Sequence, residues 1–215
     1  MRGMQDVSKS KMTSLARWHK TWQQLGAASG SEDLYDRVSA CYAESHRKYH
    51  TIQHLDECFS HFELIRDHAE HQAEVELAIW FHDAIYRVSS NDNEEKSAEW
   101  AYTSTVSSGL PKEIGERVYS LIMVTKYKVV SLSRDAEVLV DVDLGILAAE
   151  PKRFDEYELQ IRAEYAWVPE PLFRQERRKV LQEFVGRSSL YSTALFRERY
   201  EVQARENLSR SLARL

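Results

Sequence analysis

The stretch Ala78-Ile79-Trp80-Phe81-His82-Asp83-Ala84-Ile85-Tyr86 carries an imidazole and a carboxylate side by side within an apolar run. Apolar residues precede His82 at i−7, i−4 and i−3, which places His82 on the apolar face of a predicted helix and Asp83 on its shoulder. A buried carboxylate needs a partner such as a cation, so the pair suggests half of a metal site. A core histidine capped by its neighbouring carboxylate is the alternative, and the pair alone leaves both open.

The bulk properties indicate a globular protein. The chain has 215 residues, of which 43% are hydrophobic and 29% charged, and its formal net charge is −5. This length suits one domain, and the negative charge gives no reason to expect nucleic acid as a partner. No apolar run reaches the roughly 20 residues that span a bilayer, and the N-terminus lacks a signal sequence, so no membrane partner is expected. Cys41 and Cys58 favour reduced thiols in a cytoplasmic protein.

Helical periodicity dominates the chain. With 7 Gly and 4 Pro, few residues interrupt it, so we predict an all-α helical bundle forming a single domain over residues 12–215 after a disordered segment 1–11. The pattern predicts helices at 13–25, 31 to about 46, 51–65, 72–86, 94–107, 111–126 and 133–144, two that begin at Pro151 and Pro171, and one at 192–212. Ser31, Thr51, Ser133 and the Asp and Asn residues of 89–93 are the expected N-caps.

His54, His82, Asp83 and an Asp about sixty residues later form a candidate set of metal ligands. Two imidazoles with two carboxylates suit one divalent ion such as Mn, Fe, Zn or Mg and leave positions open for water and substrate. Such an ion lowers the pKa of a bound water and polarises a phosphoryl oxygen. Helices that project several side chains into a bundle core can build this site.

The order His54, His82-Asp83 and Asp143 resembles the HD superfamily of metal-dependent phosphohydrolases. In addition, Tyr49-His50-Thr51-Ile52-Gln53-His54 is similar to the Tyr-His-Asn-x-x-His motif of the cyclic-nucleotide phosphodiesterases, which belong to that superfamily. The resemblance implies that His50 donates a proton to the leaving oxygen and that His54 binds the metal. It also implies an HD-type fold and a metal-bound water as the nucleophile.

About three quarters of the chain resembles one bacterial branch of this superfamily, whose members have no assigned substrate. Five segments carry the resemblance in order: Phe81-His82-Asp83, Asp92 to Ala98, Asp141-Val142-Asp143-Leu144, Ile161 to Tyr165 and Ala204 to Leu208. The chain departs from the branch at Lys128, where a His is common, and it has no His after His82. We therefore expect one metal ion rather than two.

Two aspartates compete for the last ligand position. Asp141 and Asp143 are two residues apart, so on a helix they point about 200° from each other and cannot both face one ion. The neighbours of Asp143 on its face are apolar, whereas Asp141 shares its face with Glu137 and could be hydrated. We therefore predict Asp143 as the ligand.

Four basic residues could meet a substrate phosphate, because Arg presents a planar fork that matches phosphate. Lys126 and Arg162 are the candidates for substrate binding, while Arg177 and Arg178 are better explained by ion pairs with Glu164 and Glu176. Glu94 and Glu95 have a sufficient explanation as first-turn acids of a helix.

The resulting hypothesis is metal-dependent hydrolysis of a phosphoester, with a nucleotide or related small phosphate as substrate. Asp83 would bind the metal and orient the attacking water, and His50 would be the general acid. A metal- or nucleotide-binding module without turnover is an alternative. A di-iron oxygenase on an HD-type scaffold is another, but it needs further His ligands. The substrate, monoester versus diester chemistry and any assembly into a homo-oligomer stay open.

Overall fold

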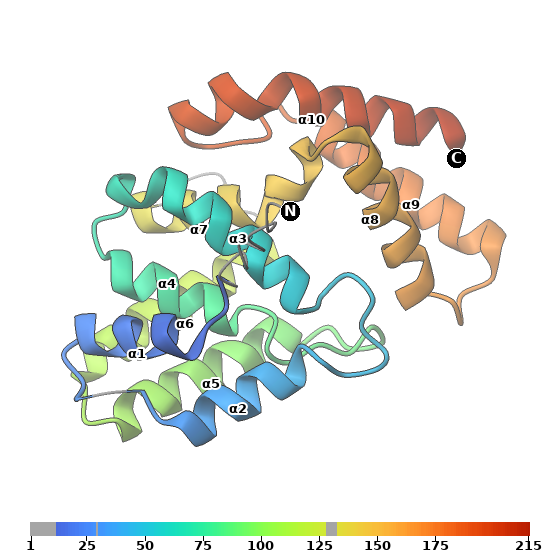
Figure 1. The fold of residues 1–215 in the computed structure, drawn as a ribbon. Coiled ribbons are helices and arrows are strands. Elements are labelled where there is room, and N and C mark those ends of the chain that lie inside the picture. The colour runs from blue at the N-terminus through green and yellow to red at the C-terminus, as the bar shows by residue number, and fades with distance from the viewer. Residues whose placement is uncertain (1–11, 29, 128–132) are drawn as a thin grey trace, which may run out of the picture.

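The computed structural model describes residues 12–28, 30–127 and 133–215, which form ten α-helices, two 3₁₀ helices and no strand. The elements are α1 (Leu15–Gln24), α2 (Glu32–Cys41), α3 (Ile52–Ile65), η1 (Arg66–His68), α4 (Gln72–Phe81), α5 (Asn93–Ser107), α6 (Lys112–Tyr127), α7 (Arg134–Asp143), η2 (Leu144–Ala148), α8 (Pro151–Glu164), α9 (Glu170–Val185) and α10 (Ala194–Arg214) (Figure 1). The all-α prediction is confirmed. The disorder predicted for 1–11, and Lys128, fall outside the described residues.

Most helices begin close to the predicted positions, and three of them begin at the predicted N-cap residues. The hydroxyls of Ser31 and Ser133 accept hydrogen bonds from backbone N–H groups in the first turns of α2 and α7, and Thr51 does the same for α3. Asp92 occupies the N-cap position of α5, but its carboxylate accepts hydrogen bonds from Ser90 and Lys96 instead of the helix. The predicted N-cap position within the 89–93 loop is therefore confirmed, but the Asp92 side chain makes no capping hydrogen bond.

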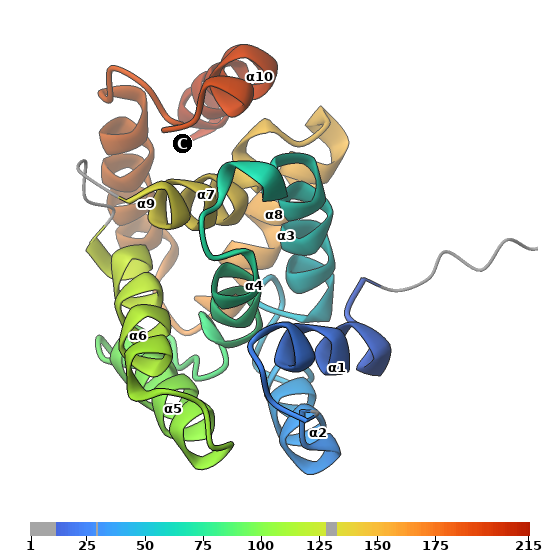
Figure 2. The ribbon, with the colours of Figure 1, turned by 90° about the vertical axis from the view of Figure 1, so that its left-hand side faces the viewer.

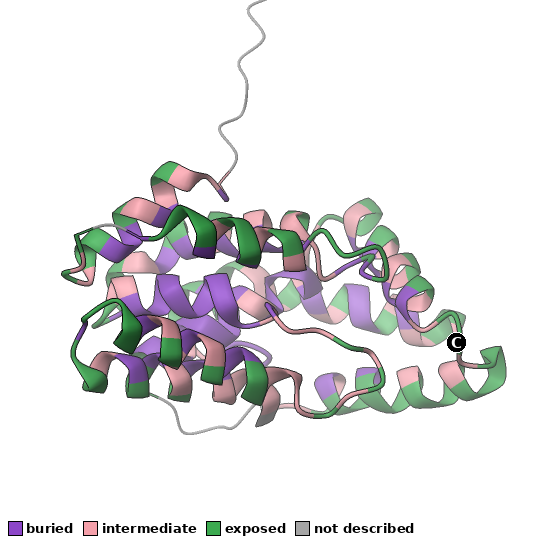
Figure 3. Ribbon diagram, turned by 90° about the horizontal axis from the view of Figure 1, so that it is seen from below, coloured by how far each residue is buried: buried purple, intermediate pink, exposed green. Residues whose placement is uncertain are grey.

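Helix α4 is the centre of the bundle. It contacts α1, α3, α5, α6 and α7, and every residue from Glu74 to Phe81 is buried (Figure 2). A helix that is buried on all sides is mostly apolar, which explains the hydrophobic run from Leu77 to Phe81. The buried Glu74 and Glu76 are compensated by ion pairs with Arg117 at 2.6 Å and Arg66 at 2.8 Å. Trp80 anchors the helix, with its ring 5.3 Å from Trp18 and 4.8 Å from Phe59. Figure 3 shows buried residues on the inner sides of the helices and exposed ones outside.

Helix α4 ends at Phe81 instead of continuing to Tyr86 as predicted. The Arg47 guanidinium donates hydrogen bonds to the carbonyls of Asp83 at 2.6 Å and Ala84 at 2.9 Å, so these carbonyls are satisfied outside a helix. The N–H of Ile85 binds Ser97 Oγ at 3.0 Å. Tertiary hydrogen bonds thus replace helical ones, and the chain turns away immediately after His82.

The last three helices form the C-terminal side of the molecule, and α10 packs on η2 and α9 (Figure 1). Asn207 of α10 donates to the carbonyls of Leu147 at 2.9 Å and Ala149 at 2.8 Å, which joins α10 to the chain that follows α7. None of the helices in the described ranges combines the length and apolar character that a membrane span requires.

Candidate metal centre

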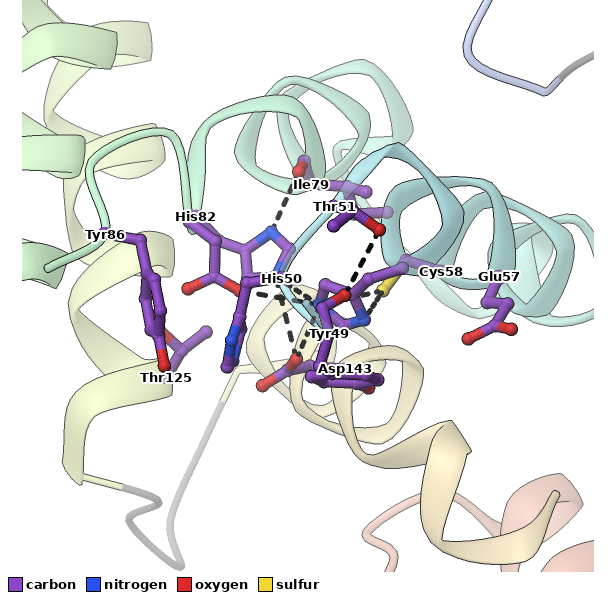
Figure 4. Close-up of polar contacts among 12 residues, drawn as sticks. Tyr49, His50, Thr51, Glu57, Cys58, Ile79, His82, Tyr86, Thr125 and Asp143 are labelled. Atoms are coloured by element: carbon purple, nitrogen blue, oxygen red, sulfur yellow. Dashed lines mark hydrogen bonds and ion pairs between the residues drawn. The ribbon is translucent and has the colours of Figure 1, made fainter. Parts of the chain in front are cut away.

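Three helices deliver the side chains that meet at the candidate metal centre. His54 lies in the first turn of α3, His82 is the C-cap residue that follows α4, and Asp143 is the last residue of α7. His54 Nε2 lies 3.0 Å from His82 Nε2, and Asp143 Oδ1 lies 3.4 Å from the first nitrogen and 3.6 Å from the second. Figure 4 shows His82 and Asp143 directed toward each other.

The protonation of His82 suits a metal ligand. Its Nδ1 lies 2.9 Å from the carbonyl oxygen of Ile79, which can only accept, so Nδ1 carries the hydrogen. In the neutral ring, Nε2 is then a bare acceptor that faces the His54 imidazole and the carboxylates. Acceptor atoms this close repel one another unless a cation or a proton lies between them. The residues present therefore fit a metal ion.

Two further donors lie beside this group. Asp83 Oδ2 is 3.1 Å from His82 Nε2 and 3.5 Å from His54 Nε2. Cys58, one turn after His54, has its Sγ 3.7 Å from both ring nitrogens of His54. The donor atoms of His54, Cys58, His82 and Asp143 lie within 4.8 Å of one another, so this buried group could hold a metal ion. Asp83 Oδ2 is the alternative fourth donor, because it approaches Nε2 of both histidines, whereas Sγ lies at equal distances from the two ring nitrogens of His54.

The electrostatics of the centre favour positive charge. Burial lowers the pKa of His82, but the charge of Asp83 and hydrogen bonds to Asp143 and Asp83 raise it well above its ordinary value. Burial raises the pKa of Asp143, but hydrogen bonds to His54 and His82 hold it below its ordinary value. Carboxylates in this centre therefore stay ionised and require a cation or imidazolium beside them.

Asp141 lies away from the centre. Its carboxylate accepts hydrogen bonds from the backbone N–H groups of Ser192 at 2.7 Å and Thr193 at 2.8 Å, and from the Thr193 hydroxyl at 2.6 Å. The sequence interpretation left Asp141 hydrated, which is wrong, because Asp141 is fully buried while the Asp143 side chain is 24% exposed. Asp141 is satisfied by the start of α10 and needs no metal.

His50 lies next to the candidate metal centre and is held by Glu164 of α8. The ring centroid of His50 is 5.9 Å from that of His54. Its Nδ1 donates to Glu164 Oε2 at 2.8 Å, and the Tyr86 ring stacks on it at 4.0 Å (Figure 4). With Nδ1 occupied by this hydrogen bond, Nε2 is the nitrogen left to exchange a proton with a substrate.

Glu164 is a residue that the sequence interpretation missed. Its Oε1 accepts the N–H groups of Lys48 at 2.7 Å, Tyr49 at 2.8 Å and His50 at 3.1 Å, and its Oε2 accepts from the Tyr86 hydroxyl at 2.9 Å. Burial raises its pKa, but the hydrogen bonds and charge of His50 and the backbone N–H groups lower it to about 2. The sequence could have indicated Glu164, because it lies in the 161–165 segment, one of the five that carry the resemblance.

Arg47 is the second residue missed. Its side chain is fully buried and donates to the carbonyl of His50 at 3.3 Å as well as to those of Asp83 and Ala84. It therefore joins the segment that carries His50 to the segment that carries Asp83. A buried Arg whose guanidinium makes four hydrogen bonds, three of them to carbonyls of two site segments, is a positioning residue.

Of the two residues predicted to bind phosphate, Arg162 is engaged in the turn after α8. Arg162 donates to Glu170 at 2.7 Å and to the carbonyls of Tyr165 and Val168, which occupies its guanidinium in the turn after α8. Lys126 lies in the last turn of α6. Arg177 pairs with Glu158 instead of the predicted Glu164.

No protein-family model matches this chain, and comparison with curated proteins and with solved structures returns no significant match.

Proposed function

We propose that this chain binds one divalent metal ion through His54, His82, Asp83 and Asp143 and hydrolyses a small phosphoester. The observation that supports this best is the convergence of two imidazole nitrogens and two carboxylates from separate segments, with His50 beside them and outside the ligand group. An oriented histidine next to a metal ligand group is what acid catalysis at a metal centre needs.

The donor set narrows the choice of metal. Imidazole nitrogens suit Zn and Fe, and carboxylates suit Mn, so these ions are favoured over Mg, which prefers oxygen ligands throughout. The bound ion would activate water and stabilise the charge that develops on a phosphoryl group. The partly exposed Asp83 carboxylate would orient the attacking water.

His50 would supply the proton that the leaving oxygen needs. Glu164 fixes the ring through Nδ1, and the face of Tyr86 restricts its rotation, so Nε2 presents the proton in one direction. A carboxylate that accepts from Nδ1 in this way holds the imidazole in one tautomer and one orientation. His50 and Glu164 would thus act as a general acid and its positioning residue.

The proposal also includes a nucleotide as the substrate. Its support, like that for hydrolysis, is the resemblance to the HD superfamily in the order His54, His82-Asp83 and Asp143. A cytoplasmic location also remains a proposal, supported by the free thiols of Cys41 and Cys58. A metal-binding module without turnover is the competing function, and substrate turnover distinguishes the two.

The test is elemental analysis of the purified protein followed by a phosphate-release screen. We expect about one Mn, Fe or Zn per chain, a rise in the melting temperature when metal is restored to chelator-treated protein, and turnover of a phosphoester. His82→Ala should lose both the metal and the melting-temperature rise. Normal metal content in His82→Ala would overturn the ligand assignment, and metal without turnover would favour the binding module.

A further inference from the structure

A groove of about 880 Å³ opens beside His50. The loop 86–94 forms one wall, and the end of α8, the turn that follows it and α9 form the other. His50 lies in its lining and also lies 5.9 Å, between ring centroids, from the metal ligand His54. A phosphoester whose leaving oxygen reaches His50 therefore has the rest of its leaving group in this groove.

The wall formed by α8 and α9 exposes large apolar side chains. Trp167 is 67% exposed, Leu172 48% and Val180 38%, and all three line the groove. Tyr165 and Phe173 lie beside them, with ring centroids 6.2 Å apart. Clustered exposed apolar groups in a concave site mark a place where a ligand buries apolar surface. This wall suits a flat aromatic group.

The charges in the groove oppose an anionic leaving group. Glu94 and Glu176 contribute carboxylates to the lining. The charge of the Arg177 guanidinium, also in the lining, is offset by Glu158; its Nη2 also donates to the Tyr157 hydroxyl at 3.0 Å, while its buried Nε has no hydrogen-bond partner. Lys179 offsets Glu176 at 2.7 Å, so a leaving group with further phosphates would be repelled mainly by the Glu94 carboxylate, whereas an uncharged one would not. The opposite wall offers Ser89 and Asn91 as polar contacts.

We propose that the groove binds an uncharged nucleoside as the leaving group, with its base stacked on Trp167. A nucleobase combines a flat apolar face with a polar edge that donates hydrogen bonds. Its face fits the aromatic wall, and its edge fits the Ser89, Asn91 and Glu94 side of the groove, because a carboxylate only accepts. This inference rests on the proposed phosphoesterase activity and makes the substrate a nucleoside monophosphate rather than a triphosphate.

The kinetic test compares nucleoside monophosphates with ribose 5-phosphate, which lacks only the base, and with nucleoside triphosphates. For the metal-loaded enzyme, we expect kcat/KM at least tenfold higher with adenosine or guanosine 5′-monophosphate than with ribose 5-phosphate, and higher than with the triphosphates. Trp167→Ala should reduce the preference for the base about tenfold, as expected for one lost stack. Leu159→Ala is the matched control, because Leu159 is 72% exposed on α8 and does not line the groove.

Two results would overturn the groove assignment. One is an equal kcat/KM for substrates with and without the base in the unmodified enzyme. The other is an equal loss of kcat/KM on both substrates in Trp167→Ala. A binding measurement separates this failure from failure of the proposed function. If no phosphoester is turned over, calorimetric titration with adenosine and guanosine alone still tests the groove. Weaker binding to Trp167→Ala than to Leu159→Ala would support it, and no nucleoside binding at millimolar concentration would overturn it.

Discussion

Each ring nitrogen of His82 and of His50 has a defined environment, and this separates their roles. His82 uses Nδ1 on the carbonyl of Ile79 and turns Nε2 to the other donors of the centre. His50 uses Nδ1 on Glu164, which leaves Nε2 as its other ring nitrogen. Because their hydrogen-bond partners differ, we propose different roles for the two histidines, metal ligand for His82 and general acid for His50.

Replacement of His50 by Ala should leave metal content unchanged and lower turnover by about 10²- to 10⁴-fold, the usual loss for a removed general acid. Steady-state kinetics and elemental analysis of the same preparation check both parts. The loss should shrink with substrates whose leaving group needs no proton, such as 4-nitrophenyl phosphate. Loss of the metal from His50→Ala would show that His50 is a ligand.

The two aspartates of α7 should respond in opposite ways. Asp143→Asn should weaken metal binding by more than about 100-fold, since loss of an outer partner alone costs 10- to 100-fold. Asp141→Asn should keep its metal affinity but lose about 1–3 kcal/mol of stability, because an amide cannot accept all the hydrogen bonds from Ser192 and Thr193. Metal titration of both apo variants and urea unfolding separate these effects, and the reverse order of affinities would move the ligand to Asp141.

At the level of elements, the site depends on how segments without regular structure are held. The segment between α2 and α3 carries His50, and the segment after α4 carries Asp83. Arg47 bridges them through three backbone carbonyls, and the Tyr42 hydroxyl bridges the Asp83 N–H and the carbonyl of Trp80 at 3.3 Å and 3.1 Å. Helices position the histidine ligands, whereas side-chain hydrogen bonds position the segments that complete the site.

Substitution of Arg47 by Met should cost about 3 kcal/mol or more of unfolding free energy, because three carbonyls lose their donor. Metal affinity should fall as well, since Asp83 would no longer be held near His82. Arg37→Met is the matched control: Arg37 is 61% exposed and its ion pair with Asp33 is long, at 3.9 Å. It should change stability by less than about 1 kcal/mol. Equal effects of the two substitutions in chemical unfolding would contradict the role of Arg47.

At the scale of the whole molecule, Glu164 connects α8 to a segment 114 residues earlier in the chain. It is the buried acid through which the C-terminal half of the chain holds His50. Its pKa falls from 4.5 to about 2 on folding, so the unfolded chain binds this proton more readily than the folded one. The stabilisation is therefore fully present above pH 4.5 and is lost as the pH falls toward 2.

The acid sensitivity of the protein should consequently depend on Glu164. Between pH 5 and pH 2 the unmodified protein should lose about 3 kcal/mol more stability than Glu164→Gln, which cannot titrate at this position. Unfolding curves measured with a chelator present exclude any contribution from metal release. Parallel pH profiles of the two proteins would show that Glu164 is not an important link between the two parts of the chain.

The sequence alone determined the features that depend on neighbours within a few residues. Ser31, Thr51 and Ser133 start helices because a hydroxyl can bind N–H groups two or three positions ahead. The apolar run of α4 marks a helix buried on all sides, and His and Asp residues embedded in or after such runs are candidate ligands for that reason. The order His54, His82-Asp83 and Asp143 is therefore a property of the sequence that requires no knowledge of the packing.

Only the tertiary structure decided the end of α4, the role of Asp141 and the partner of His50. Arg47, the start of α10 and Glu164 lie 36, 51 and 114 residues from the groups they bind. No local preference encodes such pairs, because they form only when packing of the helices brings the segments together. The groove beside His50 arises in the same way, from a turn and two helices that meet a loop far away in the sequence.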